Sequence, residues 1–287
     1  MNYSALIQNR RSVREFSDKM VITTKLLEIE AYYLQSARRL LPELETKLLI
    51  FGSDTKQALD HAAGYQSFII GSQHYLVLLS AKHPQAGINA GYLMEDLVLK
   101  LNNMGLDSCW LTFTDSEQIK LALAIGSDLD VAAIVAFGYG EKTSKRLRLN
   151  MQSMSNVDIV AQRQYFMPKH SIYDMVFMDS WGNTEGLDEF IGFYDNMLWE
   201  AFYAASLSPS YLNRQPYGFV IHKEGITLVR KPDEYTGKID GDLGLGIALL
   251  HFDGVVFQWA GRIKWRFEKS SPITLPDGYT AIATAAL

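Results

Sequence analysis

The residues with the clearest chemical potential near the N-terminus form the run Arg10-Arg11-Ser12-Val13-Arg14. Three guanidinium groups and a hydroxyl suit a phosphate or another anion, because arginine offers forked, charge-assisted donors and serine adds a short one. A solvated basic turn after a first helix has the same composition. The run is therefore a candidate anion site, with ordinary surface as the alternative.

A second candidate is the polar loop Ser208–Tyr217, with the sequence SPSYLNRQPY. It follows a predicted helix and leads into an apolar strand. Its Ser, Asn and Gln side chains offer neutral donors and acceptors, and Pro209 and Pro216 stiffen the backbone. Such a loop suits the amide-like edge of a heterocycle, although the same residue types are common in turns.

A third candidate is the basic run from Lys142 to Arg148, which follows Gly138-Tyr139-Gly140. The run could close on a phosphate, or it could be a solvated linker. The Gly-x-Gly lacks the third glycine and the helix of a dinucleotide-binding fold.

Other kinds of site find little support. The six histidines are scattered, and the metalloprotease, serine-hydrolase and Walker motifs are absent from the sequence, so no metal site is expected. The single cysteine, Cys109, stands in the apolar context DSCWLTF, which predicts a buried and inert thiol.

The hydrophobic pattern that must position these residues mixes helices and strands. In the first part we expect helices at Lys25–Leu41, Ala58–Ile70, Asn89–Met104 and Ser116–Ile125, and strands at Lys47–Gly52, Tyr75–Ser80, Leu106–Leu111 and Val131–Phe137. In the second part we expect helices at Asp188–Ser206 and Asp242–Phe252, and strands at Gly218–His222, Ile226–Val229, Val255–Trp259 and Tyr279–Thr284. Asp242 is the expected N-cap of its helix.

The order of elements repeats imperfectly. Gly105 precedes Trp110 by the same spacing as Gly254 precedes Trp259, so an offset of 149 relates the halves there. For the earlier units the offset is about 170, so the second half is expected to lack about 20 residues. Two unrelated stretches could match by chance. The predicted organisation is a half at 1–150, a wrapping linker at 151–186 and a shorter half at 187–287.

The composition is that of an ordinary globular protein. The 287 residues are 48% hydrophobic and carry a formal charge of −5, which excludes a disordered chain and a strongly basic nucleic-acid binder. The apolar stretches are far shorter than a membrane span, and Arg-Arg stands where a signal peptide needs apolar residues. A cytoplasmic protein without membrane or nucleic-acid partners is expected.

Taken together, the motifs resemble the nitroreductase family of FMN enzymes. The matching segments are R-R-S-x-R at Arg10–Arg14, S-x-x-N-x-Q-P within Ser208–Tyr217, G-L-x-S-C-W at Gly105–Trp110, and G-Y-x followed by basic residues at Gly138–Arg148. The resemblance spans nearly the whole chain. It implies an α+β, nitroreductase-like fold of two related halves, each with a central, mainly antiparallel sheet flanked by helices.

The order of the motifs departs from the family. The family's polar loop follows the arginine motif within one subunit, whereas here it lies in the second half. Family homodimers build each flavin site from both subunits. The resemblance therefore implies a fused pseudo-dimer in which one complete site remains, with one FMN per chain and a monomer as the expected state.

Roles for individual residues follow from the same resemblance. Arg10, Arg11 and Ser12 would hold the phosphate and ribityl chain, and Arg14 would lie near N1 and O2 of the isoalloxazine, where a cation stabilises the reduced flavin. Lys145 or Arg146, together with Arg148, would complete the phosphate clamp.

Further contacts are implied from both halves. The second half would line the flavin with Ser208, Pro209, Ser210 and Asn213, while Gln215 is expected to be structural. Thr112 and Phe113 stand where the family has glycines beside flavin N5, and Gln66 aligns with a ribityl or pyrimidine contact. The flavin carries the chemistry, so no catalytic side chain is expected.

The implied function is an FMN-dependent oxidoreductase. It would reduce a nitroaromatic, quinone-like or other small acceptor with NADH or NADPH by a ping-pong mechanism. Two alternatives stay open, a flavin-binding protein of the same fold with a different or lost reaction, and an interaction protein without flavin.

Overall fold

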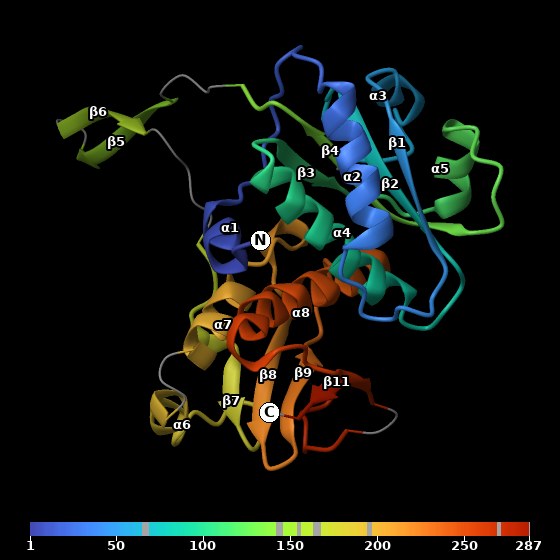
Figure 1. The fold of residues 1–287 in the computed structure, drawn as a ribbon. Helices are drawn as coiled ribbons and strands as arrows, with labels where there is room; N and C mark the ends of the chain where they lie inside the picture. Colours follow the sequence, from blue (N-terminus) through green and yellow to red (C-terminus); the bar gives the residue numbers. More distant parts are fainter. Residues whose placement is uncertain are drawn as a thin grey trace.

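The computed structural model describes residues 1–64, 69–141, 146–153, 156–162, 168–193, 197–268 and 271–286. Figure 1 shows two sheets, one above the other, with helices α4 and α8 crossing between them. The hairpin β5–β6 projects from this body (Figure 1). The arrangement is α+β, as the sequence predicts.

The upper sheet is antiparallel, with the strand order β1-β2-β4-β3. Its strands are β1 Thr46–Phe51, β2 His74–Ser80, β3 Asp107–Leu111 and β4 Asp130–Gly138. The helices of this half are α1 Tyr3–Asn9, α2 Thr23–Gln35, α3 Thr55–Ala58, α4 Ala86–Asn103 and α5 Ser116–Ala122. All residues of β2 are buried, as in a central strand covered on both faces.

The lower sheet has the order β10-β11-β9-β8-β7. Its strands are β7 Val176–Met178, β8 Tyr217–His222, β9 Gly225–Arg230, β10 Arg266–Phe267 and β11 Thr280–Ala285. The helices here are α6 Leu187–Phe193, α7 Met197–Ser206 and α8 Lys238–Ala260, with 3-10 turns η1 Ile172–Asp174 and η2 Tyr211–Asn213. The hairpin strands are β5 Arg146–Ser153 and β6 Asn156–Gln162. β7 is parallel to β8, so part of the predicted linker adds an edge strand to this sheet.

The two sheets share one topology. Without β7, the order β8-β9-β11-β10 repeats β1-β2-β4-β3. Each sheet also has one β-bulge at the equivalent position. The residue skipped in the pairing is Ala132 in β4 and Ile282 in β11, which are 150 positions apart in the sequence. A matching irregularity in matching strands supports the predicted relation between the halves.

The halves differ most in the connection between their first two strands. Residues 52–73 join β1 to β2, whereas only residues 223–224 join β8 to β9. This difference agrees with the prediction that the second half lacks about 20 residues. The longer connection carries α3 and packs against the end of β3.

The two central helices cross at glycines. A Cβ on Gly91 of α4 would lie 2.2 Å from the carbonyl oxygen of Leu243, and a Cβ on Gly246 of α8 would lie 1.9 Å from that of Ile88. Glycine is therefore required at both positions for the backbones to approach. By length and composition α8 could cross a membrane, but 78% of its most apolar window is buried inside the protein, as in a core helix.

The helix predicted at Asp242–Phe252 is present but longer, because α8 runs from Lys238 to Ala260, and the strand predicted at Val255–Trp259 is therefore wrong. Asp242 is not the N-cap of α8, a position held by Gly237. Gly254 does not end the helix, because it packs against the ring of Tyr3, with 2.6 Å from an added Cβ to Cδ1. Burial of α8 from Gly241 to Val256 overrides the weak helix propensity of its glycines and valines.

The predicted correspondence between Trp110 and Trp259 is also wrong. Trp259 lies inside α8, so it is not the counterpart of Trp110 in β3. Trp265, directly before β10, takes that place. Trp110 Nε1 donates to Glu95 of α4, and Trp265 Nε1 donates to Asp253 of α8.

Three further helix predictions need correction. α2 ends at Gln35 instead of Leu41, because the next amides turn toward α4, with Arg38 N donating to Asp96 Oδ2. The helix predicted at Ala58–Ile70 is wrong over its described residues, because α3 ends at Ala58 and Ala63 bridges to Phe113 at the first sheet, while residues 65–68 lie outside the described part. Asp188–Ser206 is described as two helices, α6 and α7.

Candidate functional site

The arginine run leaves α1 and follows the edge of the first sheet. Val13 N donates to Ser108 O at 3.0 Å, at the start of β3. Further on, Ser17 N donates to Tyr139 O at 2.8 Å. The structure thus brings together two of the predicted motifs of the first half, the arginine run and Gly138–Gly140.

Gly140 makes this close approach possible. A Cβ there would lie 2.7 Å from Oδ2 of Asp107 and 3.0 Å from Cγ1 of Val13. The same carboxylate accepts the Gly140 N–H at 3.0 Å. Gly140 therefore allows the arginine run to pack closely against the end of β4. This packing explains the glycine without a dinucleotide-binding role.

Arg10 is the most buried member of the run, with 8% of its surface exposed. Its Nε lies 3.5 Å from Oε1 of the fully buried Glu95, and its Nη1 donates to Ser12 Oγ at 3.4 Å. The Nε has no hydrogen-bond partner within the described residues. A buried guanidinium thus faces Ser12 with donor capacity left over.

The polar loop of the second half is held in a strained conformation. Leu212, Asn213 and Gln215 have φ of 48°, 59° and 47°, values that L-residues seldom adopt. Gln215, 1% exposed, accepts from His170 N and donates to the carbonyl oxygen of Ser206. These contacts fit the structural role predicted for Gln215.

Asn213 and Ser210 also serve the shape of the loop. Asn213 Nδ2 donates to the carbonyl of Pro168 at 2.7 Å, and Ser210 Oγ accepts from Gln215 N at 2.9 Å. Asn213 therefore fixes the loop against the segment that precedes η1, and Ser210 fixes the backbone within the loop. Their predicted flavin contacts stay predictions.

Lys169 joins the arginine run to this loop. Its Nζ donates to the carbonyl of Ser208 at 2.8 Å. The pKa of Lys169 is lowered to about 8, mainly by burial and also by the nearby charge of Arg10, while the charge of Glu95 opposes the shift. Lys169, Arg10 and Glu95 are therefore close enough for their charges to interact, and the cations outnumber the carboxylate.

Sequence reasoning missed both Lys169 and Glu95. Lys169 lies within residues 151–186, which the sequence predicted to be a linker. Its place directly after Pro168 gives no indication that it binds a ligand. Glu95 stands beside Asp96 in an otherwise apolar stretch of α4, where charged residues among buried positions are a signal for paired buried groups.

Comparison with known proteins identifies the family. A family model described as "Putative TM nitroreductase" matches residues 2–175, more than half of the chain. The chain belongs to this nitroreductase family. No curated protein matched it.

One solved structure shares the fold over the whole chain. A "putative nitroreductase" from Thermotoga maritima is 18% identical, covers 100% of this chain and 94% of its own, and gives a TM-score of 0.60, which shows the shared nitroreductase-like fold. A nitroreductase family protein from Clostridium novyi is 22% identical and covers 49% of this chain and 86% of its own, with a TM-score of 0.44. An FMN-dependent nitroreductase from Clostridium difficile is 19% identical and covers 48% and 88%, with a TM-score of 0.41. Family membership supports a general oxidoreductase function.

The other predicted residues of this nitroreductase-family chain lie apart from Arg10. Thr112 Oγ1 donates to Asp240 Oδ2 at 2.8 Å, and Phe113 is buried beside Ala63. Thr112 follows Ser108, the neighbour of Ser12, by four residues, or about 13 Å along an extended strand. Thr112 and Phe113 therefore mark the far end of β3 from the arginine run.

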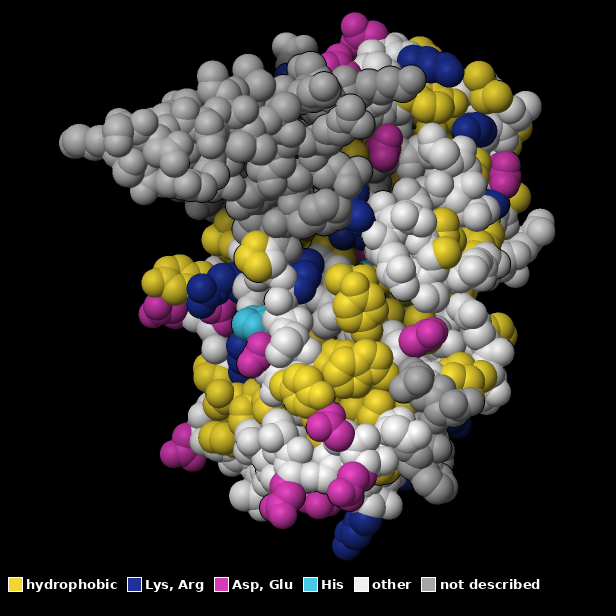
Figure 2. Space-filling model, turned by 90° about the vertical axis from the view of Figure 1, so that its left-hand side faces the viewer, with side chains coloured by type: hydrophobic (Ala, Val, Ile, Leu, Met, Phe, Trp, Pro, Cys, Tyr) yellow, Lys and Arg dark blue, Asp and Glu magenta, His cyan; other side chains and the backbone are white. Residues whose placement is uncertain are grey.

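The rest of the arginine run lies nearer the surface. Arg14 is exposed, and its charge and that of Arg10 lower the pKa of Cys109, although burial of this thiol raises it overall. Cys109 is thus buried, as predicted. Arg11 Nη1 donates to the carbonyls of Gln8 and Arg10. Figure 2 shows basic side chains where the upper and lower parts meet, on the face that carries α1 and α7.

Several predicted contacts lie beyond the described part of the chain. Gln66 and Lys145 are outside the described residues. Arg146 and Arg148 belong to β5, for which only the backbone is described. Their roles stay predictions. Within the described residues, no cluster of metal-ligating side chains occurs.

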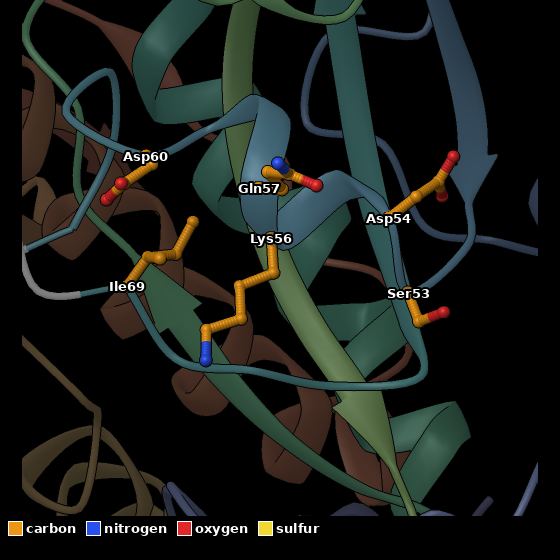
Figure 3. A pocket seen from close by; sticks show the side chains of 6 residues that line it. All are labelled: Ser53, Asp54, Lys56, Gln57, Asp60 and Ile69. Atoms are coloured by element: carbon orange, nitrogen blue, oxygen red, sulfur yellow. The ribbon is translucent and has the colours of Figure 1, made fainter.

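A pocket of about 410 Å³ opens elsewhere on the surface. It lies on the long β1–β2 connection and is lined by Ser53, Asp54, Lys56, Gln57, Asp60 and Ile69 (Figure 3). Its charged lining residues are one lysine and two aspartates, so the pocket lacks the positive charge that a phosphate needs. We therefore place the candidate site at the arginine run.

Proposed function

We propose that this protein is an FMN-dependent oxidoreductase that takes electrons from NADH or NADPH and passes them to a small acceptor. The observation that carries the proposal is the cationic junction where the arginine run, Lys169 and the polar loop of the second half meet. An FMN phosphate needs such a cluster, and membership of the nitroreductase family supports an oxidoreductase.

The residues at this junction fit the phosphate of FMN. The buried Arg10 guanidinium directs Nη1 toward Ser12, and the charge of Arg10 lowers the pKa of Lys169. A bound dianion accepts charge-assisted hydrogen bonds from this guanidinium and offsets the excess positive charge.

The proposed roles divide between the halves. Arg10, Ser12 and Lys169 bind the phosphate, and Arg11 and Arg14 add positive charge along the run. The second half contributes the loop from Ser208 to Gln215. The end of β3 at Thr112 and Phe113 borders the opposite end of the site.

The flavin, when bound, supplies hydride acceptance from the nicotinamide and electron transfer to a nitroaromatic, quinone-like or other small acceptor, which gives ping-pong kinetics. The protein's own residues bind and orient it. The fixed cation at Arg14 favours the negatively charged reduced form. No side chain is assigned as a general acid or base.

We further propose one FMN per chain and a monomeric, cytoplasmic protein. Close to Glu95, two other buried carboxyl groups, one in α4 and one in α8, are bonded to aromatic side chains of the protein. Tyr3 and Tyr32 donate to Asp96, and Tyr92 and Trp265 donate to Asp253. This packing supports a single flavin site.

The test is reconstitution with FMN followed by removal of free flavin. We expect visible flavin absorbance at one equivalent per chain, and anaerobic bleaching by NADH or NADPH. Absence of bound flavin would overturn the proposal, and two equivalents would overturn the single site. Bound flavin that neither nucleotide reduces would favour a flavin-binding protein of this fold with a different reaction.

A further inference from the structure

Glu95 lies at the centre of the junction and has no part in the contacts predicted from the sequence. It sits in α4 and is fully buried. Three donors from three segments surround its carboxylate. Arg10 Nε lies 3.5 Å from Oε1, His251 Nε2 lies 2.9 Å from Oε1, and Trp110 Nε1 donates to Oε2 at 2.9 Å.

His251 extends this network to the second half. Its Nδ1 lies 3.0 Å from the carbonyl oxygen of Ala204, near the end of α7. α7 leads directly into the polar loop, whose Ser208 carbonyl accepts from Lys169. Glu95 thus connects the arginine run of one half to the helix that carries the loop of the other half.

A carboxylate in a phosphate site needs an explanation, because its charge opposes that of the ligand. Burial alone raises the pKa of Glu95, but the hydrogen bond from His251 and the charge of Arg10 lower it below its usual value. Glu95 is therefore ionised at neutral pH. The carboxylate of Glu95 holds the Arg10 guanidinium through Nε, and Nη1 of Arg10 is left directed at Ser12.

We propose that Glu95 is a positioning residue that fixes the Arg10 guanidinium toward the FMN phosphate and, through His251, ties it to the polar loop. This inference rests on the proposed function. It assigns Glu95 an effect on the phosphate end of the ligand only. A merely structural ion pair would instead affect stability and leave the distinction between phosphorylated and unphosphorylated flavin unchanged.

The other groups facing Glu95 give the charge change a direction. Lys169 and Tyr217 are also close enough to interact with its charge. Loss of the negative charge removes the contribution that raises the pKa of Lys169, so this lysine would lose its proton at lower pH. Loss of the Glu95 charge therefore releases Arg10 and favours loss of the Lys169 proton, and both effects weaken phosphate binding.

The experiment measures the dissociation constants of FMN and riboflavin, which differ by the phosphate, on flavin-free wild type and Glu95→Gln. We expect FMN binding to weaken roughly 10- to 100-fold, the usual worth of a hydrogen bond to a charged group, and riboflavin binding to stay unchanged. The preference for FMN should also fall away at lower pH than in the wild type.

Asp96→Asn is the matched control, because Asp96 is the next residue of α4, is equally buried and bonds to Tyr3 and Tyr32 instead. It should leave the ratio of the two constants unchanged. In an Arg10→Gln background, Glu95→Gln should add little further loss, because its effect acts through Arg10.

Glu95→Asp keeps the negative charge but moves it away from Arg10 by one methylene. This variant replaces Glu95→Gln in the experiment if Glu95→Gln does not fold. It should give an intermediate loss of FMN preference. A wild-type ratio of FMN to riboflavin affinity in a folded Glu95 variant would overturn the inference alone. A wild type that binds neither flavin would overturn the proposed function and this inference with it.

Discussion

Helix α4 carries two adjacent buried carboxylates that face different surroundings. Glu95 meets the charged or chargeable groups Arg10 and His251, while Asp96 meets the hydroxyls of Tyr3 and Tyr32. The pKa of Glu95 is lowered, because His251 and Arg10 outweigh its burial, whereas burial raises that of Asp96. Neighbouring positions on one helix thus place one carboxyl group among charged partners and the other among neutral donors.

Asp253 of α8 extends the neutral region. Tyr92 and Trp265 donate to its two oxygens, and burial raises its pKa to about 7. Neutral donors satisfy a buried carboxyl group without adding charge. The difference indicates where an anion could bind. Arg10 and Lys169 outnumber the single carboxylate at Glu95, whereas Arg38 and Arg262 are matched by the two carboxyl groups of Asp96 and Asp253.

The largest effect should come from removing the cations of the Glu95 side. Arg10→Ala combined with Arg14→Ala removes two charge-assisted contacts, at about 1.5–3 kcal/mol each, so FMN affinity should fall more than roughly 100-fold. Titration of flavin fluorescence measures it. Arg266→Ala, which removes an exposed arginine on β10, should change nothing. Equal flavin occupancy in the double variant would refute this site.

The neutral side can be tested through pH. The pKa of Asp253 rises from 3.8 unfolded to about 7 folded, so the folded state holds the proton more tightly. This contribution is full below about pH 4 and is lost as pH rises through about 7, and the shift of about 3 units corresponds to about 4 kcal/mol at most. Asp253→Asn should remove that slope from the free energy of unfolding measured in urea. If the free energy of unfolding had the same pH dependence in wild type and Asp253→Asn, the raised pKa of Asp253 would be refuted.

Both sides depend on the close crossing of α4 and α8. In Gly246→Ala the added Cβ would lie 1.9 Å from Ile88 O, so the helices must separate, at about 1–3 kcal/mol or more of stability. Gly244→Ala is the control, because no atom lies within 4 Å of its added Cβ, and alanine in a helix gains up to about 1 kcal/mol. Thermal unfolding should move in opposite directions in the two variants. A lower Tm in both would remove the crossing as the cause.

Local patterns predicted the parts of the site that are local. The arginine run and the loop at Ser208–Tyr217 are contiguous in sequence, and short apolar runs located β1, β2 and β4 to within about one residue. The ends of α2 and α8 were not predicted, because contacts far away in sequence decide them. Arg38 N turns to Asp96, and Gly254 packs on Tyr3.

The junction itself could not be read from sequence. Glu95 and His251 are 156 residues apart, and neither belongs to a motif. Their meeting follows from the crossing of two helices, which no local period encodes. Lys169 was hidden for the same reason, since it becomes significant only where β7 carries the preceding segment to the lower sheet.

The smallest expected effect concerns Lys169, and it tests whether the proton on this side chain controls FMN affinity. With a pKa of about 8, Lys169 loses its charge as pH rises through that value, so FMN affinity should weaken by up to about tenfold per pH unit above it. Lys169→Arg keeps the charge at every pH in this range and should remove the dependence. Riboflavin, without a phosphate, should show no such change in either protein. An unchanged pH profile for FMN in Lys169→Arg would assign the proton to another group and leave Arg10 as the principal phosphate ligand of the charged junction.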